Sequence, residues 1–270
     1  MSTSSPPSSI LIIGSGVFGL STALALALRP AYAKTEITIL DRSPEQGVFP
    51  SHDASSIDSS RIIRPDYADP AYSALAAAAH HHWRHSPLGE DGRYTESGMA
   101  LIADAPPAHV KTRTQMDYVR DSYANVKRLA QRKECGIDAA RLTELPSRRA
   151  IAELLHDRPF AAERICWYTD TPTGDFLVDY HPGWRGLFLA TAGSGHGFKF
   201  LPIIGDHVVD CVEGRRPEAF DDKWRWRGVE RRDDDVEQVY EHIVTEDGSR
   251  GGKLGLVLAE ELTKNRRAKM

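Results

Sequence analysis

Two basic residues stand among glycines in the stretch TAGSGHGFKFLPIIGD, which runs from Thr191 to Asp206. The second of them, Lys199, comes where the apolar spacing predicts that an amphipathic helix over Phe200 to Val212 begins. A lysine there adds its charge to the positive end of the helix dipole, which is unfavourable unless a bound anion compensates both. Lys199 therefore indicates an anion-binding site, the alternative being a side chain that simply extends into solvent.

A second glycine-rich stretch, Gly14 to Gly19, follows the apolar run Ile10 to Ile13 and precedes a segment rich in alanine and leucine. This is the pattern G-x-G-x-x-G between a strand and a helix, the context that a dinucleotide-binding turn requires. Gly14 permits the tight turn, Gly16 lets the backbone approach a pyrophosphate, and Gly19 lets the helix pack close to the strand. The phosphates are expected at the helix N-terminus. A glycine-rich turn without a ligand is the alternative.

An acidic residue completes this pattern at the end of the next predicted strand. The strand EITILD ends at Asp41, 22 positions after Gly19, where an acid that binds a ribose hydroxyl is expected roughly 20 residues on. A carboxylate at this place disfavours the 2′-phosphate of NADP, so the residues alone leave FAD and NAD as candidates.

Composition and charge exclude several classes of protein. The chain has 270 residues, 34 Lys and Arg against 38 Asp and Glu, a formal net charge of −4 and a pI near 6.3, so it lacks the basic surface of a nucleic-acid partner. Cys135, Cys166 and Cys211 have no metal-type spacing, which favours a reducing compartment and predicts neither a disulfide framework nor a metal site. The apolar segment 10–30 is interpreted as a buried strand and helix rather than a signal peptide or membrane span.

The remaining patterns predict scaffold. Helical spacing starts at Pro70 and again at Met116, while YTESGMALIAD predicts a strand pair over Tyr94 to Asp104. A serine-rich loop is expected over 48–60, a buried strand over Leu187 to Ala190 and a turn over 192–197. The triple His80, His81 and His82 lies on successive helix faces, so it is interpreted as structural or surface rather than as a metal site.

Four blocks in this order resemble one family. ASSIDSSRIIRPDYAD, ICWYTDTPTGDFLVDYHP and GSGHGFKFLPIIGD, with the N-terminal fingerprint, look like the sarcosine oxidase family of FAD amine oxidases. The likeness is greatest to its fungal branch, the fructosyl amino acid oxidases or amadoriases, and covers most of Ser9 to Trp226. It implies an α/β fold: a doubly wound, Rossmann-type FAD-binding domain with a truncated substrate domain.

The resemblance also implies roles for individual residues. Cys166, otherwise interpreted as a small buried apolar residue, matches the cysteine that these enzymes link to the flavin. Lys199 and Arg64 match the cations that hold the substrate carboxylate, while Arg61 and His196 match residues near the isoalloxazine. Without the resemblance, two arginines that flank two isoleucines could also be surface charges. The expected cofactor contacts are Gly14, Gly16, Val17, Phe18, Gly19, Asp41, Arg42, Ser60, Arg61, Cys166, Gly195, Gly197 and Lys199.

The implied reaction removes a hydride equivalent from the carbon next to a secondary amine, and water then hydrolyses the imine. Oxygen reoxidises the flavin and yields hydrogen peroxide. The substrate is a fructosyl amino acid or a sarcosine-like amine, and a cluster of cations at a helix N-terminus stabilises the anionic reduced flavin. The expected partners are thus a small amine and oxygen.

One departure from the family pattern lies between His156 and Glu163, where family members carry a long central block. That block supplies much of the substrate-domain sheet, a late strand of the FAD domain and the lysine thought to activate oxygen. Two functions therefore stay open: an impaired FAD-dependent amine oxidase, and a non-catalytic flavin-binding remnant or incomplete gene product. An NAD-dependent dehydrogenase gives Cys166 and GHGFKF no role.

We expect the FAD-binding core to be assembled from both parts of the chain, Ser9 to Ile102 and Ile165 to Gly214, with Gly16 near Gly195. The C-terminal Ala268-Lys269-Met270 resembles a peroxisomal tripeptide, so we expect a peroxisomal address, or otherwise a cytoplasmic one. The expected organisation is a disordered terminus (1–9), two parts of the FAD-binding domain (10–103 and 165–226), a helical remnant of the substrate domain (104–164) and a charged tail (227–270).

Overall fold

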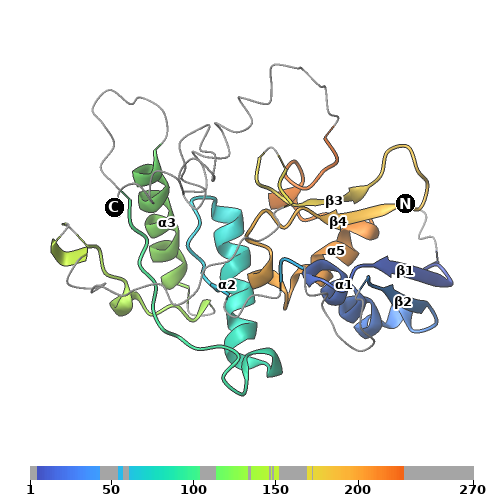
Figure 1. The fold of residues 1–270 in the computed structure, drawn as a ribbon, viewed down its shortest axis with the longest axis horizontal. Coiled ribbons are helices and arrows are strands. Elements are labelled where there is room, and N and C mark those ends of the chain that lie inside the picture. The colour runs from blue at the N-terminus through green and yellow to red at the C-terminus, as the bar shows by residue number, and fades with distance from the viewer. Residues whose placement is uncertain are drawn as a thin grey trace, which may run out of the picture.

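The structure is a computed structural model, and it describes residues 5–42, 54–56, 61–103, 114–132, 135–145, 147, 149–151, 169–171 and 173–227. Within these ranges the chain has both helices and strands, and the N-terminal part follows the strand–helix–strand order expected for an α/β fold of the Rossmann type (Figure 1). The main elements are β1 (Ser9–Ile13), α1 (Val17–Leu28), β2 (Glu36–Leu40), α2 (Pro70–His85), α3 (Gln115–Ala130), β3 (Leu177–Tyr180), β4 (Phe188–Thr191) and α5 (Ile204–Val212).

The N-terminal unit is the predicted strand, glycine turn, helix and second strand. β1 and β2 pair in parallel, from Ser9 opposite Glu36 to Ile13 opposite Leu40, with α1 as the crossover. Gly14 takes a φ of 103°, which favours glycine, and a Cβ on Gly19 would lie 1.9 Å from the Gly14 carbonyl oxygen. These two glycines therefore let the helix start directly against the strand end, as the fingerprint predicts.

The later part of the chain packs onto this unit through α5. The Ser21 hydroxyl donates to the Leu201 carbonyl at 2.7 Å and accepts from the Gly205 amide at 2.7 Å, so α1 and α5 are joined at closely approaching backbones. Arg29, at the end of α1, pairs with Asp210 and Glu213 of the α5 region at 3.0 Å each. The two sequence-distant segments lie side by side in Figure 1, so they share one core, as expected.

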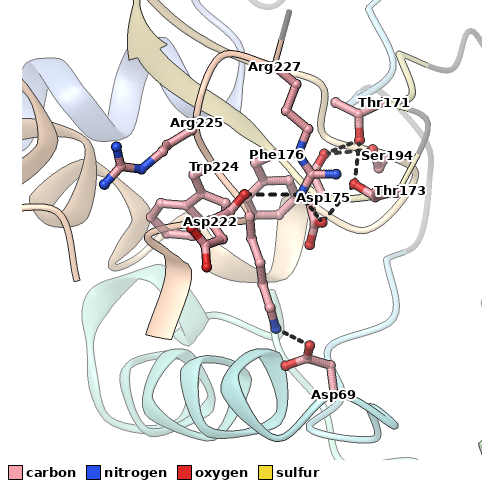
Figure 2. A network of polar contacts seen from close by, with 12 residues as sticks. Asp69, Thr171, Thr173, Asp175, Phe176, Ser194, Asp222, Trp224, Arg225 and Arg227 are labelled. Carbon is pink, nitrogen blue, oxygen red and sulfur yellow. Dashed lines mark hydrogen bonds and ion pairs between the residues drawn. The ribbon is translucent and has the colours of Figure 1, made fainter. Parts of the chain in front are cut away.

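The main core lies between α2, β3 and α5 and is rich in aromatic side chains. Tyr72, Phe176, Phe200 and Trp224 are all nearly inaccessible to solvent, and their rings contact one another edge to face or stacked. The Tyr72 hydroxyl accepts from the Trp224 indole at 3.1 Å, and Lys223 forms an ion pair with Asp69, which caps the start of α2 (Figure 2). Residues 221–227 are thereby held against α2.

Four details of the predicted elements are wrong. β1 is not a buried strand, because Leu11 is 59% and Ile13 80% exposed. Alternate side chains of a strand point to opposite faces, and in the described ranges only the face carrying Ile10 and Ile12 is covered, by α1 and α5. β4 likewise is only half-buried, and it pairs with β3 in an antiparallel sheet, with Val178 opposite Ala190.

The predicted strand pair at Tyr94 is absent from the described residues 94–103, which are mostly exposed and have no neighbouring strand to pair with. The helix predicted over Phe200 to Val212 begins instead at Ile204, after a short 3₁₀ helix over Phe198–Phe200. Pro202 lies in the intervening turn and has no amide hydrogen to continue a helix. Helices α2 and α3 agree with their predictions.

Candidate functional site

The fingerprint turn is held closed by bonds from two directions. The Gly14 amide donates to the Leu40 carbonyl at 2.7 Å, which ties the turn to the end of β2. The amide and the hydroxyl of Ser15 both donate to Asp41 Oδ2, at 2.5 and 2.7 Å. A Cβ on Gly16 would meet nothing within 4 Å, so the backbone at the N-terminus of α1 is open to a close ligand. This open turn, followed by a helix start and flanked by an acid, fits a dinucleotide pyrophosphate and ribose.

The second glycine-rich loop, residues 192–197, lies beside the fingerprint helix. A Cβ on Gly193 would lie 3.7 Å from the ring of Phe18, and one on Gly197 would lie 3.6 Å from that ring and 3.3 Å from the Gly193 Cα. Gly195 is exposed and has a φ of 67°, and the His196 amide closes the loop onto the Gly193 carbonyl at 2.8 Å. The structure thus brings the two glycine loops together at the start of α1.

Lys199 is buried rather than extended into solvent, with only 5% of its surface exposed. Its ammonium donates to the Tyr67 hydroxyl at 2.8 Å and to the His196 carbonyl at 2.9 Å. Its own carbonyl accepts from the Trp83 indole at 2.7 Å, which fixes the 3₁₀ helix against α2. The interpretation of Lys199 as a solvent-extended side chain is therefore wrong.

His196 continues this chain of hydrogen bonds, and one of the bonds places a hydrogen on its Nε2. Its Nε2 lies 3.0 Å from the Gly174 carbonyl oxygen, which can only accept, so Nε2 carries a hydrogen. In the neutral ring Nδ1 then accepts from the Tyr67 hydroxyl, 2.9 Å away. The polarity therefore runs from the Lys199 ammonium through Tyr67 and His196 to Gly174. The Phe176 ring stacks on the imidazole with centroids 4.8 Å apart.

The loop that supplies Gly174 is built from its own side chains. Thr171 donates to the Asp175 carbonyl at 2.8 Å and Thr173 to the Asp175 carboxylate at 2.7 Å. Asp175 also lies 3.6 Å from Arg227, and Figure 2 shows these groups converging on the loop. The carbonyl that orients His196 is thus fixed by the sequence TPTGD.

Arg64 and Arg61 approach the same region from the segment before α2. The Arg64 guanidinium lies 5.3 Å from the centre of the Tyr67 ring and donates to the Asp66 carbonyl. Burial opposes the charged form of Arg64, but Tyr118, Tyr67 and Asp66 outweigh it, so the pKa of Arg64 is raised. The Arg61 guanidinium lies 5.0 Å from the centre of the Phe198 ring.

A cavity of about 1310 Å³ opens beside these arginines. Arg61, Arg64, His80, Trp83, Tyr94 and Phe198 are among the residues that line it. Lys199, His196 and Tyr67 are not among them; Lys199 is buried, and both Lys199 and His196 bond to the Tyr67 hydroxyl. The structure therefore places Arg61 and Arg64 in the cavity wall, and connects Arg64 to Lys199 and His196 through the Tyr67 side chain.

Tyr67 is the residue of this cluster that the sequence interpretation missed. It is 7% exposed, and both the Lys199 and His196 side chains bond to its hydroxyl. The signal available in the sequence was its position within RIIRPDYAD, two residues before Asp69, the N-cap residue of α2. Of the other predicted site residues, Val17 starts α1 and Arg42 is exposed after β2, while Ser60 and Cys166 lie outside the described residues.

The described residues contain no group of three or more His, Cys, Asp or Glu side chains that could hold a metal ion. In the same ranges, no helix combines the length and apolar character needed to cross a membrane.

Comparisons with known proteins identify the family. The family model described as FAD dependent oxidoreductase (DAO) matches residues 9–158, more than half of the chain. An amino acid oxidase of Aspergillus flavus is 54% identical over 56 residues, which are 20% of this chain and 12% of that protein. N-methyl-L-tryptophan oxidase of Citrobacter koseri is 41% identical over 56 residues, 21% of this chain and 15% of that protein. The crystal structure of fructosamine oxidase (Amadoriase II) from Aspergillus fumigatus aligns with 82% of this chain and 89% of its own, with 20% identity and a TM-score of 0.49.

The matched segments span less than a fifth of the length of these two curated oxidases. The family model covers far more of this chain, including the glycine fingerprint, Asp41, and Arg61 and Arg64 of the cavity wall. The chain therefore belongs to the DAO family of FAD-dependent oxidoreductases.

Proposed function

We propose that this chain oxidises the secondary amine of an N-substituted amino acid, such as a fructosyl amino acid or a sarcosine-like compound. The observation that carries the proposal is the cluster of Arg64, Tyr67, His196 and Lys199 beside the two glycine loops. The Arg64 guanidinium and the Lys199 ammonium lie 5.3 and 5.2 Å from the centre of the Tyr67 ring. Together these two cations form a receptor for a carboxylate, the group shared by all these substrates. The similarity to N-methyl-L-tryptophan oxidase supports the same substrate class.

The residues that would hold FAD are those of the fingerprint, with Asp41 toward the ribose, and Cys166 as the point of covalent attachment. When bound, FAD takes a hydride equivalent from the carbon next to the amine nitrogen and passes the electrons to oxygen, which leaves as hydrogen peroxide. Gly195, Gly197 and Arg61 are proposed to contact the ring end of the cofactor, since their loop and the cavity wall meet near Phe18 and Phe198.

The protein's own contribution is orientation and charge. Arg64 lines the cavity and is proposed to bind the substrate carboxylate directly, as a guanidinium can through two parallel hydrogen bonds. Lys199 adds positive charge from behind Tyr67, where low solvent exposure reduces screening. The Nε2–H of His196 donates to the Gly174 carbonyl, so the ring is held in one orientation between Tyr67 and the loop.

An anaerobic titration tests this proposal. The purified chain, loaded with FAD, is titrated with fructosyl valine and with sarcosine while flavin absorbance is followed, and oxygen uptake is then measured on admitting air. We expect bleaching by one or both N-substituted compounds and none by valine, which carries the carboxylate without a secondary amine. Bound flavin that neither compound bleaches would contradict the proposal.

A non-catalytic flavin-binding protein is the second candidate. It is favoured by the outer face of β1, where Leu11 and Ile13 are exposed, and by the short segments shared with the curated oxidases. Loss of the central block that family members carry would weaken the positioning of the amine. Correct positioning can lower the activation free energy by roughly 7–11 kcal/mol. We therefore expect oxidation slower than that of a longer relative assayed in parallel.

We also propose a peroxisomal address through Ala268-Lys269-Met270, which lie outside the described residues, as does the tail 228–270. A fluorescent fusion carrying the last dozen or so residues should enter peroxisomes; a cytosolic signal would refute this.

The division into FAD-binding parts at 10–103 and 165–226 stays a proposal, supported by the contact between α1 and α5.

A further inference from the structure

The acid expected to bind the ribose is bonded to the turn expected to bind the pyrophosphate. Asp41 Oδ2 accepts both the Ser15 amide, at 2.5 Å, and the Ser15 hydroxyl, at 2.7 Å, across 26 positions of sequence. Ser15 is buried, with 3% of its surface exposed, and occupies the first variable position of the fingerprint, between Gly14 and Gly16.

The turn is also closed by backbone bonds that involve neither Ser15 nor Asp41. The Gly14 amide already connects it to β2 through the Leu40 carbonyl at 2.7 Å, and the first bond of α1 runs from the Leu20 amide to the Gly16 carbonyl at 3.0 Å. A serine hydroxyl placed on the same carboxylate oxygen as its own amide adds a second, charge-assisted bond. Two donors on one oxygen set the rotation of the Asp41 carboxylate, which a single bond would leave less restricted.

We propose that Ser15 is a positioning residue for FAD binding: its hydroxyl and amide hold Asp41 in the orientation that receives the cofactor's ribose. The proposal rests on the FAD dependence of the family and not on oxidation of an amine. Preorganising a binding group raises affinity because less conformational freedom is lost on association. If Ser15 instead held the Asp41 carboxylate away from the ribose, removing the Ser15 hydroxyl would make FAD bind more tightly, so the two cases give opposite changes in affinity.

The test is a double-mutant cycle in FAD affinity, using Ser15→Ala, Asp41→Asn and the double variant. All are made in the full chain with Cys166→Ser, so that any covalent attachment at that cysteine does not obscure the equilibrium. Flavin fluorescence gives the dissociation constants, and thermal unfolding without FAD records stability separately. We expect Ser15→Ala to weaken FAD binding about tenfold, and to weaken it less than twofold when Asp41→Asn is already present.

Two further variants serve as controls. Ser15→Thr keeps the hydroxyl and should bind FAD within a few-fold of the parent. Thr35→Ala removes a comparable hydroxyl bond, from Thr35 to the Pro7 carbonyl at 2.8 Å, at the opposite end of the same strand pair, and should leave affinity unchanged. Equal weakening by Ser15→Ala in both backgrounds, or tighter binding, would overturn the proposal. Failure of amine oxidation would leave these affinities unaffected, so the two proposals fail separately.

Discussion

The Tyr67 hydroxyl lies 2.8 Å from the ammonium nitrogen of Lys199, although 132 positions of sequence separate the two residues. The same hydroxyl bonds to His196 Nδ1 at 2.9 Å, so one side chain from before α2 contacts both His196 of the second glycine loop and Lys199 of the 3₁₀ helix that follows it. The Lys199 ammonium also lies 5.2 Å from the centre of the Tyr67 ring. Tyr67 is therefore both the hydrogen-bond acceptor and the aromatic face for a buried cation, which makes it a suitable residue with which to test the carboxylate receptor.

Tyr67→Phe should keep the ring but remove the hydroxyl from between Lys199 and His196. Because leaving buried groups without a partner costs about 1–3 kcal/mol, we expect the free energy of unfolding to fall by about that amount. We expect KM for the N-substituted amino acid to rise about tenfold with a smaller change in kcat. Tyr180→Phe is the control, since it loses a 3.0 Å hydroxyl bond to Val212 away from the site. Equal effects of the two variants on KM would argue against the receptor.

Arg64→Gln should separate carboxylate binding from amine chemistry. A hydrogen bond to a charged group contributes roughly 1.5–3 kcal/mol, so we expect KM for sarcosine to rise about ten- to hundredfold. An amine of similar size without a carboxylate, such as N-methylethylamine, should be oxidised slowly and equally by both proteins. Arg93→Gln is the matched control, because Arg93 also lines the cavity but is half-exposed and paired with Asp91. A uniform loss for both amines would contradict direct binding by Arg64.

His80 predicts how stability depends on pH. Burial is the largest cause that lowers its pKa, from 6.5 to about 4, and the nearby Arg84 adds to the effect. The unfolded chain therefore binds the proton more readily than the folded one, so His80 contributes stability above about pH 6.5 that is lost as pH falls toward 4. His207, whose pKa is also lowered by burial, acts in the same direction.

Denaturant unfolding between pH 7.5 and about 4 measures this loss. His80→Gln should flatten the acid side of the stability curve, although its stability at neutral pH falls because His80 also bonds to the Tyr94 hydroxyl. His81→Gln, on the exposed face of the same helix, should follow the parent curve. Parallel curves for all three proteins would show that the buried imidazole does not govern the acid transition.

The fold was predictable where a local pattern determines the structure. The spacing of Gly14, Gly16 and Gly19 after an apolar run predicted β1 and α1, and the structure shows a local steric need for glycine at Gly14 and Gly19. The exposure of Ile13 was not predictable, since an apolar run looks the same whether one or two faces of the strand are covered. Likewise, the segment from Tyr94 was predicted as a strand pair but has no described strand beside it.

The site was predictable only in part, for a related reason. His196 stands out because it lies between two glycines, and Lys199 because its charge at a predicted helix start opposes the helix dipole. Tyr67 does not, because a tyrosine near a helix start is compatible with any core, and its role depends on contacts 129 and 132 positions away. The bond from Ser15 to Asp41 is hidden for the same reason: each residue satisfies its local pattern, and the contact appears only once β1 and β2 are paired.

Gly205→Ala should break the contact that joins the two parts of the core. An added Cβ would lie 1.9 Å from the Ser21 carbonyl oxygen and 2.2 Å from its carbon, and these are backbone atoms that cannot rotate away. We expect the free energy of unfolding to fall by about 3 kcal/mol or more, because α1 and α5 must separate or shift. FAD affinity should fall with it, since the second glycine loop precedes α5 and lies against Phe18.

Gly183→Ala is the control: the nearest atom to its added Cβ is a His181 side-chain carbon at 3.5 Å, so stability should change by less than about 1 kcal/mol. Chemical denaturation of the parent and both variants measures the difference, and a Gly205→Ala protein as stable as Gly183→Ala would mean that the close approach of α1 and α5 does not hold the two parts of the chain together.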